Sequence, residues 1–275
     1  MPPLQGHAFI GRHDELDALD RWGGEAAAGD PRLVVITGAA GVGKSRLLGR
    51  LIERQRTRAA TVLLGTCHQG ATIPYLPMVS ALRPLFARPV APGASPLRDA
   101  LVAAPAPAGD TSAPAGESRR LELFLSTAGA VIDAARQGPV VLAVEDLQWA
   151  DQPSLELLGH VVSTVAQEAN LGPLPVLVVL TRRDSPMPPP GEQLMARVSR
   201  EPMQRELALD GLSELETNLL LTDRLGGRPA GQLLLAVQEA TAGNPLFVGE
   251  LLRDLADSGG PIEAEAEYRI ASARR

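Results

Sequence analysis

The chain is poor in several residue types, and each shortage excludes a class of protein. One cysteine in 275 residues leaves no partner for an intrachain disulfide and no thiolate cluster for a metal. We expect that residue, Cys67, to be a small buried hydrophobic side chain. Aromatic residues make up 3% and the formal net charge is −6. Because stacking on bases and attraction to phosphate backbones need the opposite, we expect no direct nucleic-acid contact from this segment.

Long apolar runs are also missing. No stretch approaches the ~20 residues that a helix needs to cross a bilayer. The start, MPPLQGHAFIGRHDEL, has neither the basic nor the apolar region of a signal peptide. With 45% hydrophobic and 21% charged residues, the composition is that of a folded globular protein. We expect a cytoplasmic protein with no membrane partner.

Lysine is almost absent. Lysine and arginine together number 26, yet Lys44 is the single lysine. It lies in GAAGVGKS, residues 38–45, which fits the pattern G-x-x-x-x-G-K-[ST]. The pattern follows an apolar run and precedes a helical one, which is the context that a phosphate-binding P-loop needs.

The residue types in this loop suit phosphate. Gly38, Gly41 and Gly43 allow close approach of the backbone, so that successive N–H groups can face an anion at a helix N-terminus. The ammonium of Lys44 is a compact charge that can reach β- and γ-phosphate oxygens, and the Ser45 hydroxyl would ligate Mg²⁺. The alternative is a glycine-rich turn with an incidental solvated lysine. The expected nucleotide-binding stretch is completed by Ala39, Ala40, Val42 and Arg46.

Four short β-branched runs are uniformly apolar, which is typical of parallel strands covered on both faces. These runs are residues 33–37, 61–65, 140–145 and 176–181. Helical patterns lie between them, at residues 44–58, 117–137 and 153–169. The alternation predicts an α/β domain with a parallel sheet sandwiched by helices.

After a plausible fifth strand at 205–212, the pattern becomes helical. Ser213 and Glu216 form an S-x-x-E capping box, and further helices are expected near 230–241 and 246–257. We therefore expect a small α-helical companion, or lid, domain. The predicted domains are a lead-in helix (1–30), the P-loop α/β domain (31–210), the lid (211–258) and a tail (259–275).

Two segments interrupt the α/β pattern. Residues 88–117 are rich in proline, alanine and glycine and are predicted to be a flexible surface insertion. Residues 182–193 contain several prolines, which forbid continuation of a strand or a helix.

A second motif is acidic. In VVLAVEDLQWAD, residues 140–151, an apolar run ends in Glu145 and Asp146. Carboxylates at the end of a strand beside the P-loop strand, as in a Walker B motif, can hold the Mg²⁺ shell and polarise water for attack on a γ-phosphate. The alternative is a strand followed by a helix cap, and Asp151 before QPSLELL fits an N-cap. We favour function for Glu145 and Asp146, and both roles stay open for Asp151.

Five segments in order resemble a known group: FIGRHDELDAL (9–19), GAAGVGKSRLL (38–48), VEDLQWAD (144–151), LTRRD (180–184) and GNPLFVGELL (243–252). The group is the STAND-type P-loop ATPases. More narrowly, the segments look like the origin-recognition-like AAA ATPase domain of large LuxR-type bacterial transcriptional regulators and adenylate cyclase fusions. The resemblance covers roughly residues 8 to 257.

The resemblance implies further site residues. Gly11 and Arg12 would lie near the base and ribose, although FIGR can also be a simple helix-entry turn. Arg183 would read the γ-phosphate from the end of the fourth strand, the alternative being a surface arginine. Pro245 would pack on adenine, or serve only as a first-turn proline.

The resemblance also implies ATP or ADP with Mg²⁺, and other domains or proteins as partners. The function implied is a slowly hydrolysing regulatory switch in signal transduction or transcription. One alternative is an oligomeric AAA-type mechanoenzyme or loader with continuous turnover. Another is a nucleotide-binding scaffold with impaired hydrolysis, against which the acidic pair argues.

The sequence departs from the family at three points. His13 stands where glutamate is usual, and Glu145 where aspartate is commoner, so the roles of Glu145 and Asp146 toward metal and water stay open. The chain ends about one helix after GNPLFVGELL, whereas the family continues into a winged helix and a helical repeat array. We therefore expect either an isolated ATPase module or a fragment.

Overall fold

The computed structural model describes residues 9–70, 73–86 and 114–257. Most of the expected insertion (88–117) and all of the expected tail (259–275) lie outside these residues. The chain divides into two compact units. We call residues 17–37 and 48–207 the sheet unit, and residues 1–16, 38–47 and 208–275 the helical unit.

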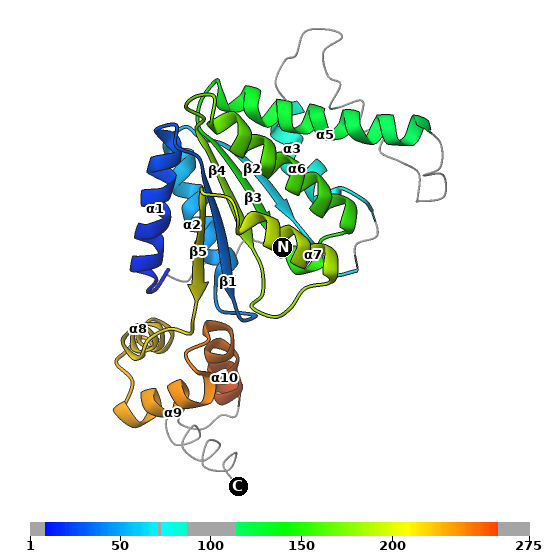
Figure 1. Ribbon diagram of the computed structural model, residues 1–275. Coiled ribbons are helices and arrows are strands. Elements are labelled where there is room, and N and C mark those ends of the chain that lie inside the picture. Colours follow the sequence, from blue (N-terminus) through cyan, green and yellow to red (C-terminus); the bar gives the residue numbers. More distant parts are fainter. Residues whose placement is uncertain (1–8, 71–72, 87–113, 258–275) are drawn as a thin grey trace. The chain divides into compact units, whose positions relative to one another are not determined.

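The sheet unit is built on a five-stranded sheet with the order β2-β3-β4-β1-β5. Its β1 and β3 both pair in parallel with β4, and β2 pairs in parallel with β3. Figure 1 shows α1 and α2 on one side of this sheet and α5 and α6 on the other. The strands are β1 (Arg32–Gly38), β2 (Thr61–Thr66), β3 (Val140–Glu145), β4 (Val176–Thr181) and β5 (Gln204–Leu209).

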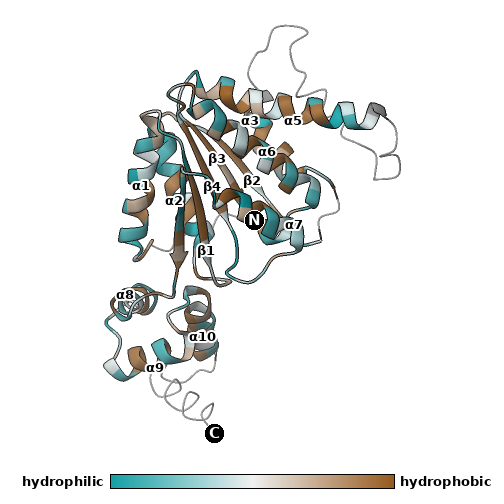
Figure 2. Ribbon diagram, viewed as in Figure 1, coloured by the Kyte–Doolittle hydropathy of each residue, from teal (hydrophilic) through white to brown (hydrophobic). Residues whose placement is uncertain are grey.

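The predicted α/β fold class is confirmed, and the four apolar runs form strands within one or two residues of the predicted bounds. Every residue of β4 is buried, and so are all but the last residue of β3. Figure 2 shows these central strands as hydrophobic. Uniform apolarity marks them because helices cover both of their faces. The edge strand β5 is mostly accessible and ends at Leu209, three residues earlier than predicted.

Helices follow the predicted pattern, with two additions. The additions are α3 and α7, and α7 begins inside the proline-rich segment 182–193. Proline is tolerated there because the first turn of a helix needs no intrahelical N–H bond. The helices are α1 (His13–Ala27), α2 (Lys44–Thr57), α3 (Leu76–Phe86), α5 (Pro114–Ala135), α6 (Gln152–Ala169), α7 (Pro189–Val198), α8 (Glu214–Leu225), α9 (Gly231–Thr241) and α10 (Pro245–Asp257).

None of the helices in the described ranges is long and apolar enough to span a bilayer. Cys67 is 2% exposed within the core of the sheet unit, as expected. Burial raises the pKa of its thiol to about 12, and the nearby carboxylates of Asp151, Asp146 and Glu145 add to the rise. The thiol is therefore protonated and unreactive in the folded chain.

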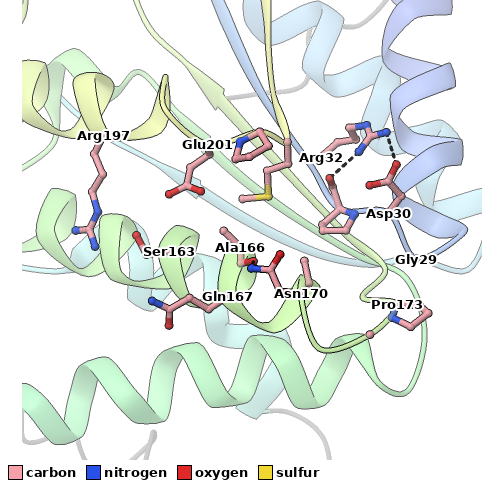
Figure 3. Close-up of a pocket in the computed structure, with 15 residues that line it drawn as sticks. Gly29, Asp30, Arg32, Ser163, Ala166, Gln167, Asn170, Pro173, Arg197 and Glu201 are labelled. Atoms are coloured by element: carbon pink, nitrogen blue, oxygen red, sulfur yellow. Dashed lines mark hydrogen bonds and ion pairs between the residues drawn. The ribbon is translucent and has the colours of Figure 1, made fainter.

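A cavity of about 630 Å³ lies at the amino-terminal end of β1 (Figure 3). Polar side chains surround it, among them Gln167, Asn170, Arg197 and Glu201. Arg32 at its wall is ion-paired with Glu25 and Asp30. The cavity contains none of the predicted site residues and lies at the end of β1 opposite to the one where the glycine loop follows.

In the helical unit, α8 begins with the predicted capping box. The Glu216 carboxylate accepts hydrogen bonds from the Ser213 N–H at 2.8 Å and from the Arg12 N–H at 2.7 Å. Gly11 and Arg12 are both left-handed, with φ of 71° and 63°, and a Cβ on Gly11 would collide with Glu216. The FIGR turn is therefore closed directly onto the start of α8.

The charge of Glu216 matters to this contact. Burial raises the pKa of its carboxyl, but hydrogen bonds from the backbone of Arg12 and from Ser213 outweigh burial, so that the pKa lies below the ordinary value of 4.5. A lowered folded-state pKa stabilises the fold above the unfolded-state pKa. That stability is lost as the pH falls through the folded-state pKa.

We predict that Glu216→Gln lowers the free energy of unfolding at about pH 7 and lowers it less at about pH 3, because the stability that the ionised carboxylate contributes declines as the pH falls below the unfolded-state pKa. Chemical denaturation at both pH values measures this difference. The matched control is Glu214→Gln, which removes an exposed carboxylate from the same helical turn. An equal loss for Glu216→Gln at both pH values would show that the ionised carboxylate contributes nothing.

Candidate functional site

The glycine loop follows β1 without a break and leads into α2. Ala39, Ala40 and Gly41 are exposed, whereas Val42 is buried. Gly43 has a φ of 109°, which an L side chain rarely adopts, and a Cβ on Gly41 would lie 2.5 Å from Cβ of Leu246. The loop therefore needs glycine at both positions and presents backbone rather than side chains.

Lys44 is drawn into this loop. Its Nζ donates to the carbonyl oxygens of Gly38 at 2.7 Å and Ala39 at 2.8 Å, and the residue is only 7% exposed. Lys44 is also the first residue of α2, whose first turn carries no acidic residue. The ammonium and the positive end of the helix dipole therefore lie together beside exposed Ser45, an arrangement that fits an anion.

Arg12 forms a hydrogen bond to the loop. It is 7% exposed, and its Nη2 donates to the carbonyl oxygen of Val42 at 3.2 Å and to that of Asp210. Its Nη1 pairs with Glu15 at 2.9 Å. The guanidinium therefore ties the FIGR turn to the loop and to the segment after β5, a role that the sequence did not indicate. A position of Gly11 and Arg12 near a base stays a prediction.

Asn244 contacts the loop from the GNPLF segment. Its Nδ2 donates to the carbonyl oxygen of Ala40 at 2.9 Å, and its Oδ1 accepts from the Leu246 N–H at 3.1 Å. Half-buried Pro245 is the first residue of α10. Sequence reasoning missed Asn244, although an asparagine directly before a proline that opens a helix is a recognisable N-cap signal.

The acidic pair ends β3 in the sheet unit. Glu145 lies beside Thr66 of β2, whose hydroxyl donates to its Oε2 at 3.4 Å. Asp146 is left-handed, with φ of 59° and ψ of 48°, and its N–H donates to Thr181 Oγ1 at 3.0 Å. Both carboxylates are half-buried where the strand leaves the sheet.

A glutamine joins Asp146 to the end of β4. The Gln148 Nε2 donates to Asp146 Oδ1 at 2.9 Å, and its Oε1 accepts from the Arg183 N–H at 3.1 Å. The Arg183 guanidinium lies over the indole of Trp149, with its central carbon 5.2 Å from the ring centre. The structure thus brings Asp146 and Arg183 together through a residue that sequence reasoning missed, because neither bond is visible in a linear pattern.

Asp151 is an N-cap. Its Oδ1 accepts from the Ser154 N–H at 2.9 Å, its Oδ2 accepts from the Ser154 hydroxyl at 2.6 Å, and the Tyr75 N–H adds a bond of 3.3 Å. Of the two roles that the sequence left open for Asp151, these bonds show the structural one.

Strand register relates β1 to the acidic pair. Ile36 of β1 and Val144 of β3 lie on either side of β4, opposite Thr181 and Leu180 respectively. The carboxyl ends of β1 and β3 therefore flank that of β4 at one edge of the sheet. In open α/β sheets, this edge is where ligands bind.

Comparison with known proteins gives one family. The model for the AAA ATPase domain matches residues 8–179. A curated relative, an uncharacterized protein of Rhizobium meliloti, is 28% identical over 285 residues, which cover 90% of this chain and 25% of the relative. The chain thus spans about a quarter of the length of that relative.

An ORC protein and a STAND protein are among the solved structures with a similar fold. The ORC2 protein of Aeropyrum pernix, solved as ADPNP and ADP complexes, is 15% identical with a TM-score of 0.54, over 98% of this chain and 70% of that one. A STAND protein with a tetratricopeptide repeat sensor from Pyrococcus horikoshii is 16% identical with a TM-score of 0.54, over 87% of this chain and 29% of that one. At such identities the likeness establishes the fold alone. The match to the family model covers more than half of the chain, and the chain therefore belongs to the AAA ATPase domain family.

Proposed function

We propose that this chain binds ATP with Mg²⁺ at the glycine loop, hydrolyses it slowly, and serves as a regulatory switch module. The observation that carries the proposal is the loop itself, in which exposed small residues, the α2 N-terminus and the ammonium of Lys44 converge. Membership of the AAA ATPase domain family supports the same reading.

In this proposal, residues 38–45 cradle the phosphates. Lys44 would exchange its bonds to the neutral Gly38 and Ala39 carbonyls for bonds to phosphate oxygens, which is favourable because both partners are then charged. Ser45, Glu145 and Asp146 would hold the Mg²⁺ shell, and the ion would neutralise charge that builds up on the β- and γ-phosphates. Arg46 completes the loop.

Asp146 is the proposed partner of the attacking water. Its backbone is held by Thr181 and its carboxylate by Gln148, so the group is pre-oriented. Arg183 would read the γ-phosphate from the end of β4. At the other end of the nucleotide, Pro245 would pack on the adenine, and the turn of Gly11 and Arg12 would lie near the ribose.

The proposed conformational switch depends on the residues of the helical unit that form hydrogen bonds to the loop. Asn244 holds the Ala40 carbonyl and Arg12 holds the Val42 carbonyl. A phosphate that reshapes the loop therefore acts on α10 and on the segment before α8, and two nucleotide states would stabilise two arrangements. We propose that such a change passes to other domains or to protein partners in signal transduction or transcription, the setting that the STAND neighbour's sensor suggests.

We predict that Lys44→Ala abolishes binding of Mg²⁺-ATP, because it removes the charge aimed at the phosphates. Loss of the two hydrogen bonds of its ammonium costs on the order of 1.5–3 kcal/mol of stability for each bond, and we expect the variant to stay folded. Titration with a fluorescent nucleotide and a thermal melt measure the two effects. Arg50→Ala is the matched control, since Arg50 is an exposed cation on α2 paired with Glu53. Undiminished affinity of the folded Lys44→Ala variant would contradict the loop assignment.

We predict that Asp146→Asn leaves nucleotide affinity largely intact and slows single-turnover hydrolysis by a factor on the order of 10², because the water needs its base chiefly in the transition state. If the variant hydrolyses ATP at the wild-type rate, the role passes to Glu145. If the Glu145→Gln variant does so as well, the acidic pair is not catalytic. The wild-type hydrolysis rate per chain is also measured over a range of protein concentrations. A rate that rises with concentration would indicate oligomeric turnover instead of a switch.

A further inference from the structure

The Gln148 side chain lies between a hydrogen-bond acceptor and a hydrogen-bond donor, and a side-chain amide satisfies both. Its NH₂ group faces the Asp146 carboxylate at 2.9 Å, and its carbonyl oxygen faces the Arg183 N–H at 3.1 Å. A carboxylate in its place could accept from Arg183 but not donate to Asp146, and an aliphatic side chain could do neither. The amide therefore bridges the residues that follow β3 and β4.

The backbone around Gln148 is held in place. Residues Leu147–Trp149 form a single 3₁₀ turn, in which the Trp149 N–H donates to the Asp146 carbonyl at 2.9 Å. Leu147 anchors this turn in the core with 2% exposure. The turn starts from left-handed Asp146, a conformation that costs a non-glycine residue about 1–2 kcal/mol. A strained residue that persists is one whose surroundings over-determine it, and Gln148 is part of those surroundings.

The bridge also divides the Asp146 carboxylate into two unequal oxygens. Oδ1 accepts the Gln148 amide, while Oδ2 accepts no hydrogen bond from any residue in the described ranges. One oxygen is thus oriented by protein, and the other is left without a hydrogen bond from the described residues. A general base needs an oxygen that can accept a proton from water, and Oδ2 is the one left for that role.

We propose that Gln148 is a positioning residue for hydrolysis: it holds Asp146 Oδ1 so that Oδ2 meets the attacking water, and it couples that carboxylate to the backbone of Arg183. This rests on the proposed function, because it assumes that Asp146 serves the water. Movement of Arg183 on contact with a γ-phosphate shifts the Gln148 amide and with it Asp146. Contact of Arg183 with the third phosphate would therefore reach the Asp146 carboxylate through the Gln148 amide.

The neighbouring indole makes this coupling measurable. Trp149 adjoins Gln148 in the chain and lies under the Arg183 guanidinium. Trp22 is the other tryptophan in the sequence, so a Trp22→Phe background reports Trp149 alone. A cation over an indole changes its emission when it moves, whether or not ATP is cleaved.

The test compares Gln148→Glu and Gln148→Met in the Trp22→Phe background. Gln148→Glu has nearly the shape of the parent but sets a second carboxylate against Asp146, whereas Gln148→Met has a similar length and no charge. We expect both to bind Mg²⁺-ADP and a nonhydrolysable ATP analogue with affinities close to the parent. Single-turnover hydrolysis should fall by about tenfold or more, the loss expected for one hydrogen bond to a charged group, and further for Gln148→Glu than for Gln148→Met.

Emission gives the second readout. In the parent, Mg²⁺-ADP and the ATP analogue should give two distinct Trp149 spectra, and in Gln148→Met the difference should shrink or vanish despite confirmed binding. The matched control is Gln152→Ala, which removes an exposed amide that bonds Glu156 on α6 at 2.9 Å. This control should hydrolyse ATP and report nucleotide as the parent does.

Three outcomes overturn the proposal in distinguishable ways. Parental hydrolysis and spectra in both Gln148 variants would show that the bridge has no role, while the proposed function stands. If the loss of hydrolysis rate in each variant parallels its loss of melting temperature, and the loss is smaller for Gln148→Glu than for Gln148→Met, the residue only maintains the fold. A parent that hydrolyses no ATP would overturn the proposed function, and this proposal with it.

Discussion

The ammonium of Lys44, held by the carbonyl oxygens of Gly38 and Ala39, is the interaction on which the helical unit's site depends. It keeps a positive charge inside a loop that offers only backbone. A loop of this shape can form because Gly41 and Gly43 adopt left-handed conformations directly after a buried strand. We expect that without this cation the loop would retain its turn but lose the positive charge that suits an anion.

The remaining carbonyls of the loop are held by other elements. Arg12 takes the carbonyl of Val42, and Asn244 takes that of Ala40. Each of these residues is anchored in turn: Arg12 through its own N–H to the α8 capping box, and Asn244 as the cap of α10. A ligand that changes the conformation of the loop must therefore change contacts that lead to both α8 and α10. These contacts, all within one compact unit, are the physical basis of the proposed switch.

The other proposed site residues lie where β3 and β4 end. Asp146, Gln148 and Arg183 form a chain of hydrogen bonds from the end of β3 to the end of β4. The end of β4 lies between those of β3 and β1, and the glycine loop continues from β1. In the proposed function, phosphate binding would follow from the end of β1 and water activation from the end of β3.

The strands and the capping box were predictable because their signals are local: uniform apolarity marks a strand covered on both faces, and S-x-x-E marks a helix start. Other features depend on distant partners. The start of α7 at Pro189 was missed because proline was treated as a break and not as a first-turn residue. The contacts of Asn244 and Gln148 join residues that are 204 and 35 positions apart from their partners Ala40 and Arg183, a separation that no short motif encodes. The expected position of Arg12 near a nucleotide stays a prediction, and the bonds of its guanidinium to Glu15, Val42 and Asp210 had no signal in the sequence.

The most direct measurement of the central claim uses the single lysine. An amine-directed reagent can modify only Lys44 and the α-amine of the chain, so intact-mass spectrometry with peptide mapping follows both sites in one sample. If Lys44 contacts the phosphates, saturating Mg²⁺-ATP should slow its modification many-fold while the α-amine reacts at an unchanged rate. Modification of Lys44 at the same rate with and without Mg²⁺-ATP would contradict the account.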